Sequence, residues 1–221
     1  MKVLVVAAWE PELVRFRERL SGAPAGVELV LATLGVGLVE ASIAMTRCVA
    51  REAPAAALLL GTCGVFEKEK RAAVGSVVTG DVARLADASI LEGTAALPGP
   101  MPAEVTFDRG LRDALVAAGA RSVQIANTVG ITTSDALAES LAAKTAADVE
   151  HLEAFAFARA CAAADIPCAT ALGVANVVGA KGRAEWLANH VGASQEAADV
   201  AWRALGAIVT SLASRTTTTA R

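Results

Sequence analysis

The chain has 221 residues, of which 54% are hydrophobic and 19% charged, a composition that supports a large buried core and excludes disordered and fibrous proteins. With 20 Lys and Arg against 23 Asp and Glu, a net charge of −3 and only 4% aromatic residues, no nucleic-acid partner is expected. The mean hydropathy is +0.49, but apolar runs such as 55–61 are far shorter than the roughly 20 residues that span a bilayer, so no membrane partner is expected.

Short runs of Val, Ile, Leu and Ala alternate along the chain with longer helical patterns. Several of these runs are apolar at every position, which is typical of strands covered by helices on both faces. The predicted strands span residues 2–8, 27–34, 56–61, 75–81, 122–129 and 167–175, and the predicted helices span 11–21, 38–52, 109–118, 134–144, 150–164 and 194–214. This order predicts an α/β fold, a three-layer αβα arrangement with a central mixed β-sheet, in which ligands bind at the carboxyl ends of strands.

The same composition on both sides of residues 93–104 indicates that this Pro- and Gly-rich stretch is a loop and not a linker between domains. A single domain is therefore expected over residues 1–215. The polar residues 216–221 are expected to form a disordered tail.

The first apolar run ends at Trp9 and has no small-residue cleavage site, so it predicts a buried strand and not a signal peptide. The cysteines lack the CxxC spacing of zinc sites, and reduced core thiols of a cytoplasmic protein are expected. Neither a metal nor another cofactor is expected. The cysteines are Cys48, Cys63, Cys161 and Cys168.

Two acidic residues, Glu10 and Glu12, come directly after the first predicted strand. A carboxylate between the end of a strand and the start of a helix is in a position typical of active sites. Acids in the first turn of a helix also interact favourably with the helix dipole without any catalytic role. Both interpretations stay open.

Small residues follow the second and third strands as Gly35–Gly37 and Gly61–Gly64. Glycines let a backbone approach a ligand closely, but they also form tight turns. A dinucleotide-binding site is disfavoured, because its fingerprint has a third glycine and follows the first strand. A nucleophilic Cys63 would need a histidine base, and neither His151 nor His190 lies in an obvious pairing context.

The predicted helix at 150–164 begins with a cluster of acids. Glu150 and Glu153 are three residues apart and would share one face of that helix. Capping explains the first acids of the cluster, but Glu153 leads into an apolar stretch, where burying a carboxylate is costly unless it is hydrogen-bonded. His151 is expected at the surface or at an interface.

Taken in order, these segments resemble the nucleoside phosphorylase/nucleosidase superfamily, from residue 1 to about residue 212. The matching segments are residues 7–12, 35–37, 61–64, 74–78, 149–154 and 173–179. The futalosine hydrolase branch is the most similar, because its helix begins with a Val-Glu-x-Met-Glu-Gly motif like residues 149–154. Its segment after the last core strand is similar to Asn176-Val177-Val178-Gly179, with Lys181, Arg183 and Trp186.

The resemblance implies hydrolysis of the N-glycosidic bond of a 6-oxopurine nucleoside, namely release of hypoxanthine from futalosine in menaquinone biosynthesis. Glu12 would activate the attacking water with a raised pKa, and Glu153 would hold the ribose hydroxyls. Asn176 would donate from its amide to N7, and to O6, of the departing purine. By position, the other substrate-binding residues would be Trp9, Gly37, Thr62, Cys63, Gly64, Ile131, Thr132 and Leu152.

The chain also departs from the pattern of its apparent relatives. Leu152 and Ala154 replace a usual Met and Gly, and residues 170–173 lack an arginine that many relatives carry. Phosphorylases have phosphate-binding arginines that the loop 61–66 lacks, and methylthioadenosine/S-adenosylhomocysteine nucleosidases usually have Asp in place of Asn176. These two activities and a non-catalytic nucleoside-binding protein stay open as alternatives. Relatives commonly form homodimers or larger homo-oligomers, and the same is expected here.

Overall fold

The computed structural model describes residues 1–66 and 71–219, with the side chains of residues 1–66 and 71–215. The strands in these residues are β1 (Lys2–Ala7), β2 (Glu28–Thr33), β3 (Ala56–Val65), β4 (Val77–Leu85), β5 (Glu104–Thr106), β6 (Arg121–Asn127), β7 (Val149–His151) and β8 (Cys168–Val177). The helices are η1 (Glu10–Leu13), α1 (Val14–Arg17), η2 (Leu20–Gly22), α2 (Leu38–Glu52), α3 (Ala88–Leu91), α4 (Arg109–Ala117), α5 (Asp135–Thr145), α6 (Ala154–Ala162) and α7 (Gly182–Thr219).

The strands form one mixed sheet in the order β2-β1-β3-β7-β6-β4-β5, and β8 pairs with both β3 and β4. β1 and β8 run parallel to β3, so the carboxyl ends of these three strands lie on the same side of the sheet. β7 runs antiparallel to β3, and β8 runs antiparallel to β4. Because β6 pairs with β4 and β7, the strands β3, β8, β4, β6 and β7 close into a ring.

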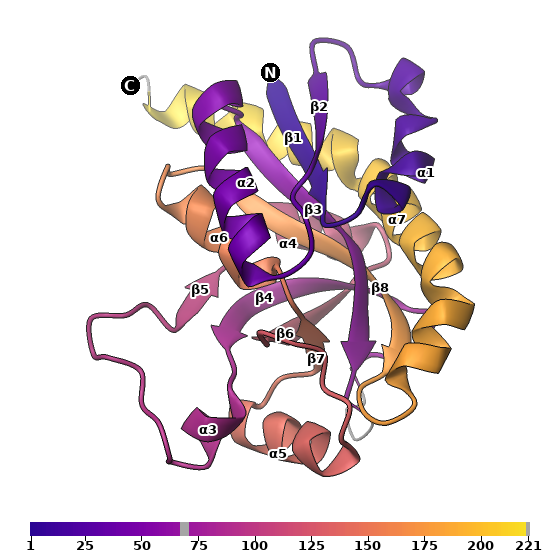
Figure 1. Cartoon of the computed structure of the whole chain (residues 1–221). Helices are drawn as coiled ribbons and strands as arrows, with labels where there is room; N and C mark the ends of the chain where they lie inside the picture. The colour runs from indigo at the N-terminus through magenta and orange to yellow at the C-terminus, as the bar shows by residue number, and fades with distance from the viewer. Residues whose placement is uncertain (67–70, 220–221) are drawn as a thin grey trace.

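Helices cover both faces of the sheet, as the sequence predicts (Figure 1). α2 and α6 pack on one face, while α1, α4 and α7 pack on the other. The sequence of β1 is apolar at every position after Lys2 because helices bury both faces of this strand. Leu4 and Val6 belong to the core with α2 and α6, whereas Val3 and Val5 belong to the core with α7, and all four are fully buried. The predicted mixed sheet between helical layers is confirmed.

One predicted helix begins too early, because residues 149–151 form a strand. β7 pairs with β6 and β3, and all its residues are buried. α6 then begins at Ala154, with Glu153 as its N-cap residue. Pairing on two sides and burial outweigh the helical appearance of this acidic segment. The predicted shared helix face of Glu150 and Glu153 is therefore wrong.

The last helix is longer than the sequence predicts. α7 begins at Gly182, and Ser194, where the sequence predicts the helix to begin, lies inside it. The backbone of residues 216–219 continues α7, whereas the sequence predicts a disordered tail from 216 onward. Residues 220–221 lie outside the described residues. The early start of α7 is the most important difference for function, because its first turns line the cavity described below.

The structure also tests the expected core thiols. All four cysteines are free and buried, so the prediction of core thiols is confirmed. Within residues 1–66 and 71–219, no helix has both the length and the apolar character needed to cross a bilayer.

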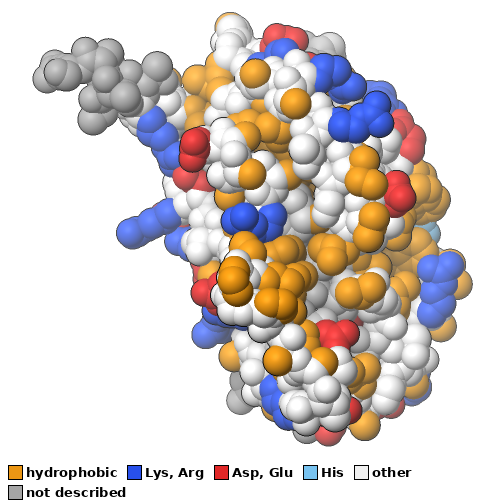
Figure 2. Space-filling view, turned by 60° about the vertical axis from the view of Figure 1, so that its left-hand side comes forward, with side chains coloured by type: hydrophobic (Ala, Val, Ile, Leu, Met, Phe, Trp, Pro, Cys, Tyr) orange, Lys and Arg blue, Asp and Glu red, His pale blue; other side chains and the backbone are white. Residues whose placement is uncertain are grey.

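The surface carries hydrophobic patches among charged side chains (Figure 2). Val36, just before α2, and Val39 and Ile43, in its first two turns, are among the exposed large hydrophobic residues. Such patches occur at protein interfaces as well as on monomers. The homo-oligomer and the single domain over residues 1–215 stay predictions.

Candidate active site

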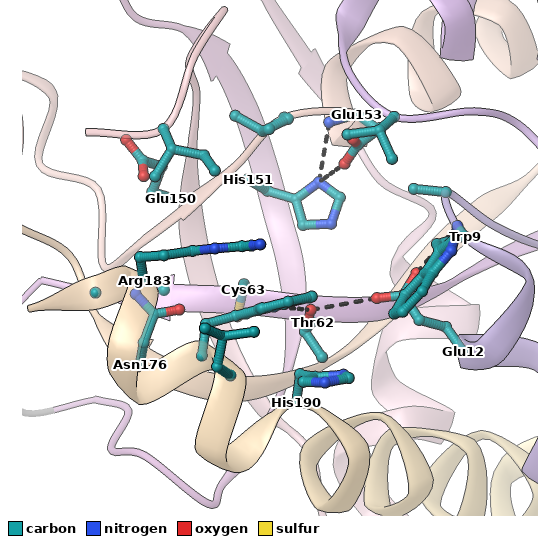
Figure 3. Close-up of a pocket in the computed structure, with 18 residues that line it drawn as sticks. Trp9, Glu12, Thr62, Cys63, Glu150, His151, Glu153, Asn176, Arg183 and His190 are labelled. Carbon is teal, nitrogen blue, oxygen red and sulfur yellow. Dashed lines mark hydrogen bonds and ion pairs between the residues drawn. The ribbon is translucent and has the colours of Figure 1, made fainter. Parts of the chain in front are cut away.

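A cavity of about 480 Å³ lies at the carboxyl ends of β1, β3 and β8, beside the first turns of α7 (Figure 3). This is the edge at which parallel strands commonly present ligand-binding residues. The predicted site residues that line it are Trp9, Glu12, Thr62, Cys63, Gly64, Ile131, Leu152, Glu153 and Asn176. Gly37 and Thr132 do not line it directly, although each donates a hydrogen bond to an acidic residue that does.

Glu12 is a buried carboxylate held by a short relay of hydrogen bonds. The Trp186 indole Nε1–H donates to Thr62 Oγ1 at 3.1 Å, and the Thr62 hydroxyl donates to Glu12 Oε1 at 3.2 Å. The Trp9 backbone N–H donates to Glu12 Oε2 at 3.3 Å. Burial raises the pKa of Glu12 from an ordinary 4.5 to about 7; the Trp9 and Thr62 hydrogen bonds oppose this rise, and the Glu153 charge adds to it. A carboxylate with a pKa near 7 is suited to act as a general base.

Glu153 is a second buried carboxylate on the same cavity, 5% exposed. The Gly37 backbone N–H donates to Glu153 Oε1 at 2.7 Å. Gly37 has a φ of 92°, a conformation that favours glycine, so the loop before α2 is shaped to bring this N–H to the carboxylate. The contact satisfies only part of the acceptor capacity of Glu153, and the remainder is free for a ligand's donors.

The structure corrects the prediction for His151, which is buried and lines the cavity instead of lying at the surface. Its Nδ1 accepts hydrogen bonds from the backbone N–H groups of Glu153 and Ala154, both at 3.1 Å. The imidazole therefore caps α6, a task that the Glu153 side chain does not perform. Burial lowers the pKa of His151, so the ring is neutral near pH 7.

Glu150 lies in β7 and is held by Thr132 instead of sharing a helix face with Glu153. The Thr132 hydroxyl donates to Glu150 Oε1, and its backbone N–H donates to Oε2 at 3.3 Å. Burial raises the pKa of Glu150, and these hydrogen bonds oppose the rise. Thr132 thus supports the cavity wall through Glu150.

Asn176 reaches the cavity because of a bulge between β3 and β8. Cys63 pairs with Val174 and Gly64 with Asn176, so β8 has one extra residue at this point. The Asn176 Nδ2 donates to the Val177 carbonyl at 2.9 Å, and the amide oxygen is directed toward the cavity in Figure 3. The amide therefore presents an acceptor, which differs from the donor role that the resemblance to the superfamily implies.

Side chains from the start of α7 form an aromatic wall that the sequence reasoning did not assemble. Trp186 and His190 stack with ring centroids 4.2 Å apart, and Trp9 lies 5.8 Å from His190. The Arg183 guanidinium lies 4.9 Å from the centroid of Trp186. Arg183, Trp186 and His190 have the spacing of one helix face, but that signal requires a helix that starts at Gly182.

Cys63 does not have the properties of a nucleophile. Burial raises the pKa of its thiol, so the thiolate that nucleophilic attack requires is not formed near pH 7. In the described part of the chain, no group of three or more His, Cys, Asp and Glu side chains is arranged to hold a metal ion. The ionisable groups that can act on a ligand here are the carboxylates and the imidazoles.

Comparisons with known proteins agree with this fold. A sequence model of the phosphorylase superfamily matches residues 7–211. A mutant of futalosine hydrolase from Helicobacter pylori superposes with a TM-score of 0.84 and 14% identity, over 93% of this chain and 99% of that one. A methylthioadenosine/S-adenosylhomocysteine nucleosidase from Colwellia psychrerythraea, solved in complex with adenine, superposes with a TM-score of 0.83 and 18% identity. The match covers 94% of this chain and 95% of that one.

One curated relative is also similar in sequence. It is a 5'-methylthioadenosine/S-adenosylhomocysteine nucleosidase from Tolumonas auensis, 35% identical over 104 residues. The match covers 41% of this chain and 44% of the relative, so it spans less than half the length of either protein.

Proposed function

The chain belongs to the phosphorylase superfamily, and on that premise we propose that it is an N-glycosidase that hydrolyses purine nucleosides, with futalosine as the preferred substrate. The observation that carries the proposal is the pair of buried carboxylates, Glu12 and Glu153, on one cavity. One has a pKa of about 7, and the other keeps acceptor capacity for hydroxyl groups. A nucleoside needs both: a base that activates water and a group that holds the sugar.

The geometry supports a simple reaction. Glu12 takes a proton from a water molecule, whose oxygen bonds to the ribose C1′ carbon. The C1′–N9 bond breaks with its electron pair going to the purine, which takes a proton from solvent water at N7 and leaves as the free base, and Glu12 then returns its proton to solvent. The oxocarbenium character of C1′ is matched by the negative charge of Glu153 beside the sugar.

Water is the proposed nucleophile because the cavity offers little to hold phosphate. Among the described residues that line it, Arg183 is the only Lys or Arg, and its guanidinium lies against Trp186. Phosphate recognition usually uses several cationic or backbone donors.

The choice of base rests on Asn176. As the base leaves with a proton on N7, that N–H can donate to an amide oxygen directed into the cavity. Asn has no proton to transfer, so it suits a leaving group that needs less assistance than adenine. The resemblance of residues 149–154 and 176–186 to the futalosine hydrolase branch supports futalosine in particular.

A second candidate is a methylthioadenosine/S-adenosylhomocysteine nucleosidase. The relative from Tolumonas auensis favours it, and so does the Asn176 amide oxygen directed into the cavity, which can accept a hydrogen bond from a 6-amino group.

A chromatographic assay of base release separates these candidates. The purified protein is incubated with futalosine, inosine, methylthioadenosine and S-adenosylhomocysteine, each with and without phosphate, and Glu12→Gln is the control. Hypoxanthine from futalosine, independent of phosphate, supports the proposal, and adenine release supports the second candidate. Release only with phosphate indicates a phosphorylase, and no release from any substrate would leave a nucleoside-binding protein.

A further inference from the structure

His151 occupies the cavity wall without a part in the reaction described above. Its ring is buried beside Glu153, and Nδ1 lies 3.3 Å from Glu153 Oε2. Figure 3 shows the imidazole between the Glu153 carboxylate and the open part of the cavity, with its second nitrogen directed into that space.

The hydrogen bonds at Nδ1 fix the tautomer of this imidazole. Two backbone N–H groups donate to Nδ1, so this nitrogen carries a lone pair and no proton. A neutral imidazole then carries its proton on Nε2. Within the described residues no group accepts a hydrogen bond from Nε2, so the N–H is presented to whatever fills the cavity.

Resting on the proposed function, we propose that His151 is a substrate-binding residue whose Nε2–H donates to one ribose hydroxyl while Glu153 accepts a hydrogen bond from the neighbouring one. A sugar hydroxyl both donates one hydrogen bond and accepts others. The Glu153 carboxylate is an acceptor only, and the His151 Nε2–H is a donor only, so together they can hold the two neighbouring hydroxyls of a ribose. His151 Nδ1 lies 3.3 Å from Glu153 Oε2, and Nε2 is directed away from that carboxylate into the cavity, so the two groups face neighbouring positions there.

Such a pair distinguishes ribose from deoxyribose more sharply than the carboxylate alone. Without the hydroxyl, the His151 N–H would face an apolar carbon, and a buried donor without a partner is costly. The competing explanation is that His151 only caps α6 and has no contact with the ligand.

Two substitutions separate the capping role from the binding role. In His151→Asn the side-chain oxygen takes the place of Nδ1 and still caps α6, but the Nε2–H donor is lost. In His151→Gln the amide nitrogen takes the place of Nε2, while the capping acceptor is lost. We expect the Asn variant to keep the wild-type Tm with about tenfold lower kcat/KM for the ribonucleoside. We expect the Gln variant to melt earlier but to lose less kcat/KM.

The matching 2′-deoxy and 3′-deoxy nucleosides complete the test. For the deoxynucleoside that lacks the recognised hydroxyl, the Asn variant and the wild type should have equal kcat/KM. An Asn variant with wild-type kcat/KM for the ribonucleoside, or with the same tenfold loss for both deoxynucleosides, would overturn the inference.

Failure of the proposed function gives a different result. If the wild type releases no base from any nucleoside, the proposed hydrolase is wrong. The dissociation constants for inosine and its two deoxy forms are then measured by calorimetry for the wild type and His151→Asn. A tenfold weakening for inosine that disappears with one deoxy form supports the role of His151, whereas equal constants, or no binding by the wild type, overturn it.

Discussion

Glu12 is the residue on which the reaction depends, because it combines burial with a direct position on the cavity. Replacing Glu12 by Gln keeps the size of the side chain but removes the base, so kcat should fall by about 10²- to 10⁴-fold. For the wild type, only the ionised form of Glu12 can take a proton. With a pKa of about 7, kcat/KM should rise with pH and level off above about pH 7. A pH profile that is flat from pH 5 to 8 would contradict this role.

Ionisation of Glu12 also lowers the stability of the folded protein, so stability falls with pH where kcat/KM rises. Because the pKa of Glu12 is about 7 in the folded protein and near 4.5 when unfolded, the folded state binds the proton more tightly. The stabilisation is complete below about pH 4.5 and is lost as pH rises through about 7, a change of about 3 kcal/mol at most. Thermal melting should therefore show Glu12→Gln gaining Tm over the wild type at pH 8 and not at pH 5.

Thr62 tunes Glu12 through the hydroxyl that links it to Trp186. The hydrogen bond from Thr62 stabilises the ionised carboxylate and lowers its pKa. In Thr62→Val the pKa of Glu12 should rise, so the acid side of the kcat/KM profile should move to higher pH, with activity at pH 7 about threefold lower. Thr62→Ser keeps the hydroxyl and should keep the wild-type profile. Equal pH profiles of kcat/KM for the Val and Ser variants would show that the Thr62 hydrogen bond does not affect the pKa of Glu12.

At this scale the sequence predicts residues that chemistry or family resemblance makes conspicuous. Glu12, Glu153 and Asn176 are polar side chains that follow strands or begin helices, at places where a hydrophobic core does not require an acid or an amide. All three line the cavity. The sequence predicts His151 at the surface, because a side chain that accepts hydrogen bonds from the backbone of a following helix leaves no periodic signal. The orientation of an amide such as Asn176 also depends on a neighbouring carbonyl, which only the folded chain supplies.

Among the elements, α7 depends most closely on a single glycine in β8. A Cβ atom added at Gly173 would lie 2.0 Å from the Ala193 carbonyl oxygen, a backbone atom that cannot move without shifting the helix. Gly173→Ala should therefore destabilise the protein by about 3 kcal/mol or more, measured by denaturant unfolding. It should also lower activity, since α7 carries Trp186 and His190 to the cavity.

Gly206→Ala is the matched control for this prediction. Gly206 lies on an exposed part of the same helix, and no atom beyond the neighbouring helix backbone lies within 4 Å of its added Cβ. Alanine is the better helix former, so this variant should gain about 0.5–1 kcal/mol. If Gly173→Ala is as stable as Gly206→Ala, the close contact between β8 and α7 is not as described.

The elements that the sequence misses share a physical cause. β7 has three residues, too few for any period, and its acids resemble a first helical turn. The start of α7 is hidden because Ser194 looks like an N-cap and Gly192 looks like a break, although both lie inside the helix. In both places packing against the sheet decides the structure, and local preference does not.

At the scale of the whole molecule, the cavity exists because distant strands close into a ring. The pairing of Gly64 with Asn176 joins positions more than a hundred residues apart, and its register is shifted by a bulge. The helix and strand order predicts a mixed sheet between helices, but it does not contain the register that turns Asn176 inward. That register depends on contacts between elements that no local pattern records.

Since the cavity is built from both ends of the chain, a ligand that fills it should stabilise the entire fold. A ligand that binds only the folded state at about 100 times its Kd adds about 2.7 kcal/mol, which for a chain of this size raises Tm by about 5–10 °C. In the Glu12→Gln background, inosine should produce such a shift in thermal melting without being consumed. Hypoxanthine alone should produce a smaller one, because it leaves Glu153 without a sugar to bind. Equal shifts for the two would place the binding energy in the base alone and contradict a sugar site at Glu153, whereas no shift at saturating inosine would mean that the cavity does not bind nucleosides.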